Sequence, residues 1–260
     1  MLKNILTKIG RSTISFLNAV GKLTVMTITS IISIKKIHIY IDQVMENFIY
    51  IGRDSLPLLV GSAAFMGLVV GLQIGTGAGP FTPPWVEGGI VIKLVLLEMG
   101  PIIFGLLLAG RVSAGISSEI GEMNVTEQID ALRTAAINPV EYIVMPRVLA
   151  GMLAVPMLII WGDIISILFS YVSLYIVVGL TWPGFVKGMR SAFIPTDMYT
   201  SVIKGFIFGI VITSLGCYFG LQAEHGAKGV GRATTSSVIW ASIVIITFDY
   251  VISAALVFVW

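Results

Sequence analysis

Three carboxylic acids lie inside long apolar runs of the chain. Glu98, Asp163 and Asp249 are each flanked on both sides by aliphatic or aromatic residues. A charged side chain at the centre of a membrane costs roughly 2.5–3.5 kcal/mol on insertion scales, so such acids face a partner or a water-filled cavity. They could relay ions, bind the polar part of a substrate, or join helices. Both a functional and a structural role are open for Glu98, whereas for Asp163 a hydrogen bond to Ser166 or a neighbouring helix is preferred.

The sequence lacks the motifs of a self-contained enzyme. It has no G-x-x-x-x-G-K-[ST] to cradle ATP, no G-x-S-x-G for a serine nucleophile and no H-E-x-x-H for zinc. Its two histidines, His38 and His225, are far apart in the chain. The glycines of GTGAGP follow an apolar helical stretch, which argues against a dinucleotide fingerprint. We therefore expect no catalytic site, metal site or cofactor in this chain.

The composition indicates that the elements holding these acids are membrane helices. Of 260 residues, 56% are hydrophobic and 12% are charged, and the mean hydropathy is +0.96. Soluble domains usually carry about 25% charged residues, and a bilayer can accept apolar surface that a soluble core of this size cannot. The net charge of +2 is too small to suggest a nucleic-acid partner. The chain is thus predicted to be an all-α membrane protein.

Five apolar stretches are long enough to cross a bilayer. They cover approximately residues 56–74, 90–109, 148–180, 204–221 and 238–258. The third is too long for one upright span, so it forms either one long helix or a span with an extension. Glycines at four-residue spacing in the first and fourth stretches predict close approach of neighbouring helices. Pro101 lacks an N–H and is expected to disturb the second span.

The first 53 residues differ from the rest. Lysines and arginines alternate there with aliphatic residues at a spacing that gives one basic and one apolar helix face. The apolar run 23–34 is too short to span and ends in Lys35-Lys36, not in a cleavage site. We expect residues 1–53 to form one or two interfacial helices on the membrane, or alternatively an amphipathic helix packed on the bundle. Residues 54–260 would form the transmembrane domain.

The stretch 111–147 is rich in charged residues and lies between the second and third spans. Asn124 and Glu127 could cap a helix that starts at Val125 and ends before Asn138-Pro139. Its apolar stripe would consist of Val125, Ile129, Leu132 and Ala136. Such a helix could be a solvated connector, or it could press its stripe into a groove on a partner.

The distribution of basic residues predicts the orientation. If the N-terminus is cytoplasmic, five spans place the C-terminus on the periplasmic side. The cytoplasmic basic residues are then Lys3, Lys8, Arg11, Lys22, Lys35, Lys36, Arg53, Arg111, Arg133, Arg147, Lys228 and Arg232, and the outer ones are Lys93, Lys187, Arg190 and Lys204. This bias follows the positive-inside rule, so the stretch 111–147 is expected in the cytoplasm.

Three blocks carry a resemblance to a known family. They read AGRVSAGISSEIGEMNVTEQIDAL, INPVEYIVMPR and GVGRATTSSV. They resemble the MlaE-type permeases, the membrane subunits of MCE-associated ABC transporters that move phospholipids between the inner and outer membranes of bacteria. The resemblance covers roughly residues 50–260, and its E-Q-I-D-A-L and G-R-A-T-T blocks are specific to that group.

The resemblance implies a set of partners. It implies a homodimer in the bacterial inner membrane, with a cytoplasmic ABC ATPase that binds ATP and magnesium, a periplasmic MCE-domain protein and, in many systems, a STAS-domain protein. The ATPase would dock on the helix between spans two and three, with docking residues Glu127, Gln128, Asp130, Leu132 and Arg133.

The resemblance also implies a lipid pocket between two permease copies. Its expected residues are Leu72, Gln73, Leu97, Glu98 and Pro101. Leu97 stands where the family commonly has an arginine, which argues against a headgroup contact through a cation at that position. Asp163, Asp249 and Arg232 are expected to have structural roles.

The predicted function is therefore that of a permease subunit that moves phospholipid between the inner membrane and a periplasmic carrier or the outer membrane, while the ATPase supplies the free energy. The alternative from a different class is a stand-alone secondary transporter in which Glu98, Asp163 and Asp249 relay ions. A third reading is a membrane scaffold. The direction of transport and the lipid class stay open at this point.

Overall fold

The computed structural model describes residues 2–77 and 83–259, and all regular secondary structure in these residues is helical. In chain order the elements are α1 (Leu2–Ile32), η1 (Ser33–Ile39), α2 (Ile41–Gly77), α3 (Pro84–Leu94), η2 (Val95–Met99), α4 (Gly100–Leu108), η3 (Ala109–Ser113), α5 (Ala114–Val125), α6 (Gln128–Thr134), η4 (Val140–Val144), α7 (Met145–Val178), α8 (Trp182–Ala192), α9 (Pro195–Leu221) and α10 (Ala227–Val259). The predicted all-α membrane class is confirmed.

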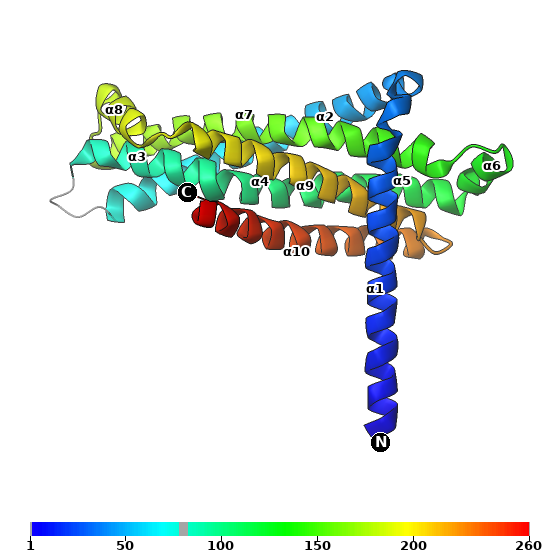
Figure 1. The fold of residues 1–260 in the computed structure, drawn as a ribbon. Coiled ribbons are helices and arrows are strands. Elements are labelled where there is room, and N and C mark those ends of the chain that lie inside the picture. The colour runs from blue at the N-terminus through cyan, green and yellow to red at the C-terminus, as the bar shows by residue number, and fades with distance from the viewer. Residues whose placement is uncertain (1, 78–82, 260) are drawn as a thin grey trace.

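The long helices form one bundle. Figure 1 shows α2, α4, α7, α9 and α10 running along a common direction, with α6 at one end of the bundle and α8 at the other. The bundle contains the five predicted spans, but each helical stretch is longer than its apolar run. The stretches run over Ile41–Gly77, Pro84–Val125, Val140–Val178, Pro195–Leu221 and Ala227–Ala255. Helix α2 passes through residue 53 without a break, so the expected domain boundary does not coincide with a helix end.

Helix α1 lies crosswise to the bundle and nearer to the α6 end than to the α8 end (Figure 1). The stretch Thr13–Lys35, which runs from α1 into η1, is itself long and apolar enough to be a sixth candidate span. If the bundle crosses the membrane, the crosswise direction of α1 fits a helix that lies in the membrane plane, as expected for residues 1–53. The apolar run 23–34 underestimated the length of this helix, because α1 continues without a break through the basic residue Lys22.

The third span is one helix. Helix α7 has 34 residues and continues through Pro156, which corresponds to about 51 Å at 1.5 Å per residue. Its neighbour α2 comes very close: Ser170 Oγ donates to Gly67 O at 2.9 Å, and a Cβ on Gly67 would collide with the Ser166 carbonyl. Gly151 of α7 and Gly209 of α9 meet in the same way. The predicted role of the glycine stripes is thus confirmed.

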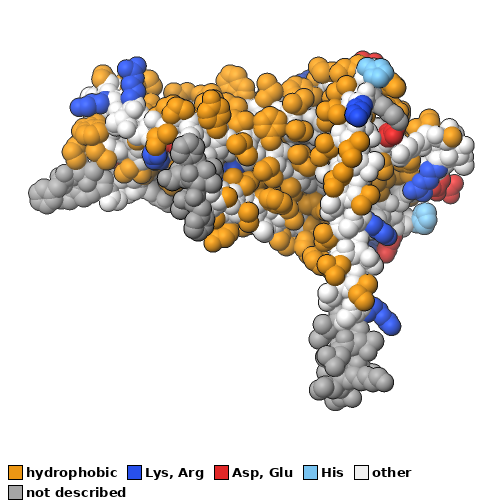
Figure 2. Space-filling view, viewed as in Figure 1, with side chains coloured by type: hydrophobic (Ala, Val, Ile, Leu, Met, Phe, Trp, Pro, Cys, Tyr) orange, Lys and Arg blue, Asp and Glu red, His pale blue; other side chains and the backbone are white. Residues whose placement is uncertain are grey.

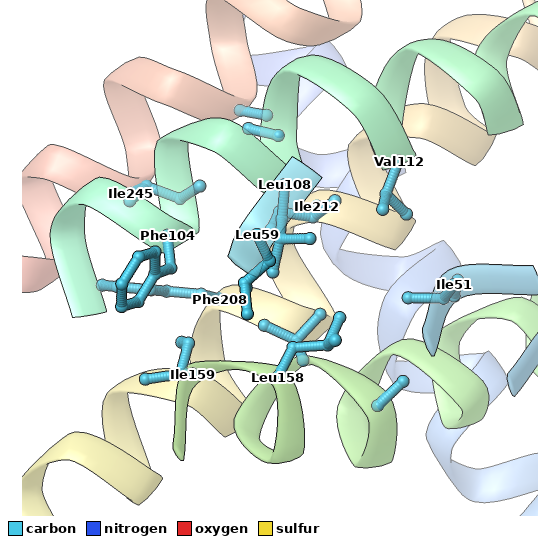
Figure 3. Packing of buried hydrophobic residues seen from close by; sticks show 14 of the residues in the cluster. Ile51, Leu59, Phe104, Leu108, Val112, Leu158, Ile159, Phe208, Ile212 and Ile245 are labelled. Carbon is cyan, nitrogen blue, oxygen red and sulfur yellow. The ribbon is translucent and has the colours of Figure 1, made fainter. Parts of the chain in front are cut away.

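The core between these helices is aliphatic and aromatic. Figure 3 shows Leu59, Leu108, Leu158 and Phe208 turned toward one another from α2, α4, α7 and α9. All four side chains are buried. On the outside, Figure 2 shows hydrophobic side chains over the middle of the visible face and charged ones gathered toward the two ends. This distribution is typical of a bundle whose middle meets lipid.

The second span is a continuous helical path with two π-helical turns, η2 and η3. Pro101 has no N–H to offer the carbonyl of Leu97 four residues earlier. In the turn just before it, the Gly100 N–H donates to Val95 O, five residues back. The predicted disturbance at Pro101 therefore takes the form of a π turn over Val95–Met99.

The helix predicted from Val125 is shorter and starts later. Helix α5 continues to Val125, a turn follows, and α6 covers only Gln128–Thr134. Asn124 is not its cap, because its Nδ2 donates to Ala223 O at 2.9 Å. Asn138 does not stop this helix either, since its Oδ1 accepts from the N–H of Val140 at the start of η4. Both side chains form hydrogen bonds with backbone groups outside α6, which the local sequence pattern could not reveal.

Candidate functional site

A buried lysine stands at the centre of a polar cluster within the bundle. Lys204 on α9 is 0% exposed. Its Nζ donates to the carbonyl of Leu97 at 2.6 Å and lies 3.3 Å from Glu98 Oε2 and 2.8 Å from Asp249 Oδ1. An ammonium group can be buried in a membrane protein only if its donors and its charge are matched. One carbonyl and two carboxylates do so here.

The carbonyl that Lys204 binds is available because of Pro101. In a regular helix the N–H of residue 101 would bond to Leu97 O, but proline has none. The π turn and the proline thus leave an acceptor at the point where α9 crosses. The predicted lipid-pocket residues Leu97 and Pro101 therefore contribute through the backbone: one offers the acceptor and the other leaves it free.

Glu98 is the only member of the cluster with substantial exposure. Its side chain is 44% exposed, against 7% for Asp249 and 0% for Lys204. Its Oε1 accepts from Ser253 Oγ at 2.7 Å while Oε2 faces Lys204. Helices α10 and α9 thus hold the carboxylate from two sides. A ligand that approaches this cluster meets Glu98 first.

A third acid extends the cluster. Asp163 of α7 is buried, and its Oδ2 accepts from Ser201 Oγ at 2.8 Å. Ser201 lies one turn before Lys204 on α9. The other carboxylate oxygen faces Gly100, where a Cβ would collide with it. Of the two partners expected for Asp163, the neighbouring helix is confirmed through Ser201 of α9, whereas Ser166 Oγ donates instead to Ala63 O and Gly162 O.

The charges of the cluster do not balance. Glu98 and Asp249 contact a single lysine, which leaves one negative charge when both acids are ionised. Low polarity around the site strengthens every charge interaction within it. The cluster is therefore better suited to a cationic group than to an anionic one.

The other two residues predicted for the lipid pocket lie apart from this cluster. Leu72 and Gln73 are exposed on α2 near its Gly77 end. Among the side-chain contacts of the described residues, none joins Gln73 to Glu98. Within one chain, the five predicted pocket residues thus form two groups, and their common role as a lipid pocket stays a prediction.

The predicted docking residues lie on the short helix at the end of the bundle (Figure 1). Ile129 is buried and fixes α6 to the core. Asp130 and Arg133 are largely exposed and paired at 2.9 Å, and Glu127, with φ of 61°, starts the helix in the left-handed region. Gln128 is exposed and donates to Thr126 Oγ1, while Leu132 is half-buried. The exposed side of α6 is therefore polar, and the apolar stripe, expected either on a solvated connector or as a docking face, is partly used within the chain.

Comparison with known proteins gives the family. Residues 44–255 match the family described as Permease MlaE. The chain belongs to the MlaE permease family. Its members are membrane permease subunits of ABC transporters, and the ATPase is a separate subunit.

Individual relatives align over 80% or more of the permease. A probable ABC transporter permease protein of Rickettsia felis is 35% identical over 253 residues, which cover 97% of this chain and 98% of that protein. The intermembrane phospholipid transport system permease protein MlaE of Haemophilus influenzae is 28% identical over 262 residues, with 98% of both chains covered. A probable ABC transporter permease protein of Synechocystis is 29% identical over 80% of both chains.

The sequence pattern predicted Lys204 of the permease at the outer end of a span and did not indicate its role in the cluster. The apolar run starts at residue 204, but helix α9 begins at Pro195. Lys204 therefore lies nine residues, or about 14 Å, inside the helix. The signal was present, because a proline at the first helical position followed by Asp197 is a typical helix start.

Arg232, expected to be structural in the permease, pairs with Glu224 at 3.2 Å. The two side chains are 65% and 71% exposed, so water screens the pair and its contribution to stability is small. The buried pairing of Asp249 fits the structural role expected for it much better. Among the described residues, no group of three or more histidines, cysteines or acids is placed to hold a metal ion.

Proposed function

We propose that this permease moves phospholipid between the bacterial inner membrane and a periplasmic carrier or the outer membrane. The observation that carries the proposal is the cluster of Lys204, Glu98 and Asp249. In this cluster the partly exposed carboxylate of Glu98 lies within an otherwise apolar bundle. A diacyl lipid needs this combination, because its chains gain about 0.8 kcal/mol per buried methylene while its headgroup needs polar partners.

The lipid pocket in this proposal lies between two copies of the permease. Helices α2 and α10 both carry exposed apolar side chains on the outside of the single chain, among them Phe65, Val69, Trp240 and Tyr250. A pocket completed by a second copy would explain why Leu72 and Gln73 are exposed in one chain. Glu98 and Gln73 would line the mouth of the pocket and receive the headgroup.

The free energy comes from an ATPase subunit at the α6 end. The chain has no phosphate-binding loop of its own, and α6 presents Asp130, Arg133 and Gln128 to the outside. In this arrangement α6 and the N-terminus are cytoplasmic, while α8 and the C-terminus are periplasmic. An MCE-domain protein would sit at the α8 end, and a STAS-domain protein would bind the ATPase.

The test is lipid transfer by the intact complex reconstituted in vesicles. We expect Glu98→Ala to lower the transfer rate by roughly ten- to a hundredfold, since a charge-assisted hydrogen bond contributes about 1.5–3 kcal/mol. Assembly with the ATPase should not change. The control is Glu122→Ala, which removes an exposed acid of α5. Transfer at the wild-type rate would remove the headgroup role of Glu98.

One observation favours a second function. Polar groups of α7, α9, η2 and α10 form a row in which Ser201 contacts Asp163, and Lys204, one turn farther along α9, contacts Glu98 and Asp249. Such a row could relay ions in a secondary transporter. The two functions differ in their energy source: transport that continues without any ATPase subunit and follows an ion gradient would support the relay.

A further inference from the structure

A polar cavity lies at the α6 end of the bundle, separate from the cluster around Lys204. Its volume is about 450 Å³. The first turns of α2 form one wall, α5 forms another, and η4 with the start of α7 closes the third side. The polar residues that line it are Gln43, Glu46, Asn47, Glu119, Tyr142 and Arg147.

The cavity lies on the α6 side of a charged group that joins α2 to the second span. Arg111 of η3 contacts Asp54 at 3.7 Å and Ser55 at 2.7 Å, both on α2. Glu46 precedes Asp54 by eight residues, and Glu119 follows Arg111 by eight, so both lie about 12 Å farther along their helices. If the apolar middle of the bundle crosses the membrane, a ligand reaches this cavity from the aqueous side at the α6 end.

The lining has an excess of negative charge. Arg147 is 8% exposed, and its Nη2 contacts Glu119 Oε1 at 2.5 Å while Nη1 donates to Ile143 O. This neutralises Glu119 but not Glu46, which has no ion-pair partner in the described part of the chain. The cavity as a whole thus carries one negative charge more than positive.

Two buried polar atoms of the lining have no partner within the described residues. Gln43 Oε1 can accept a hydrogen bond and Arg147 Nε can donate one, and neither does so. An unpaired buried acceptor costs about 1–3 kcal/mol, so Gln43 Oε1 points to a donor that completes it, whereas Arg147 Nε is a donor and would need an acceptor. An incoming cation with a hydrogen-bond donor would pair with Glu46 and Gln43 together.

We propose that this cavity receives a basic side chain, lysine or arginine, of the ATPase subunit. The inference rests on the proposed function, because it takes the ATPase as the partner. Met123, Ile143 and the ring of Tyr142 offer apolar surface for the methylene stem, and Glu46 and Gln43 receive the charged end. A phospholipid headgroup fits less well, because its phosphate would lie against a lining with excess negative charge.

The position of the cavity gives the contact a mechanical role. Met123 is two residues from the end of α5 and Tyr142 lies in η4, so the walls are the two segments that carry α6. The third wall, α2, is one helix from Ile41 to Gly77 and is about 55 Å long. A side chain held here would tie the ATPase to α2 as well as to α6.

The test measures ATPase binding to the purified full-length permease. We expect Glu46→Lys to weaken binding by roughly ten- to a hundredfold, since like charges are then opposed in the contact. The milder Glu46→Gln should weaken it less. The control Asp42→Lys makes the same charge change on an exposed residue of α2 that does not line the cavity, and it should leave binding nearly unchanged. Glu46 is exposed, so these variants are expected to fold.

A second measurement identifies the occupant. A photo-reactive phenylalanine analogue in place of Tyr142 should cross-link the ATPase at a peptide with a lysine or arginine. Cross-links to lipid or to an acidic segment, or equal ATPase binding by Glu46→Lys and the wild type, would overturn the proposal. Absence of ATPase binding by the wild-type permease would instead refute the proposed function.

Discussion

Removing the ammonium of Lys204 should destabilise the permease strongly. The group makes three contacts, to Leu97 O at 2.6 Å, Asp249 at 2.8 Å and Glu98 at 3.3 Å, and it is fully buried. Lys204→Met keeps the length of the side chain but leaves Asp249, at 7% exposure, without a counter-charge. Breaking a buried pair by removing one partner costs about 3–5 kcal/mol. We expect a loss of this size in the free energy of unfolding.

A double-mutant cycle separates this effect from lost packing. Asp249→Asn alone leaves Lys204 paired with Glu98, so we expect it to cost only about 1 kcal/mol. Combined with Lys204→Met it removes the orphaned charge, and a large part of the 3–5 kcal/mol should return.

The assay is unfolding of the purified permease in mixed micelles as the fraction of a denaturing detergent rises. All four proteins of the cycle are compared under the same conditions. A loss below about 1 kcal/mol for Lys204→Met, or no recovery in the double variant, would refute the reasoning that charge pairing holds the cluster together.

Two further predictions concern docking and helix packing. Reversing the charges of Glu127 and Asp130 to lysine should release the ATPase, because both acids lie on the exposed side of α6; recovery of the intact complex on purification would show that α6 is not the docking element. Gly67→Ala should lower the free energy of unfolding by about 1–3 kcal/mol, since a Cβ there collides with the Ser166 carbonyl. Gly61→Ala on the same helix has free space and should stabilise by up to about 1 kcal/mol; similar effects of the two would contradict the close approach of α2 and α7.

The architecture was largely predictable because a bilayer imposes simple demands. Apolar length alone located five spans, and the glycine spacing correctly indicated close approach on α2 and α9. The helix ends were less predictable. Polar residues such as Asp197 and Glu119 continue a helix beyond the apolar run, because helices can extend past the membrane surface.

The site was predictable only in part, because the apolar runs did not show where the helices begin and end. Glu98 stood out because a carboxylate within an apolar run is conspicuous. Lys204 did not, because the apolar run begins at that residue and a basic residue at the end of a span looks like a membrane anchor. Its partner atoms, the Leu97 carbonyl and the Asp249 carboxylate, lie 107 and 45 residues away, so only the fold brings them together.

The structure also separates acids that the sequence could not distinguish. All three stand in similar apolar surroundings along the chain, yet Asp163 and Asp249 are buried against Ser201 and Lys204, whereas the side chain of Glu98 is 44% exposed. A ligand can reach only an acid that retains exposed surface. Of the three, Glu98 can therefore contact a substrate, while the other two orient the groups around it and balance their charge. Substitution of Asp163 or Asp249 should thus act first on stability, and substitution of Glu98 first on transport.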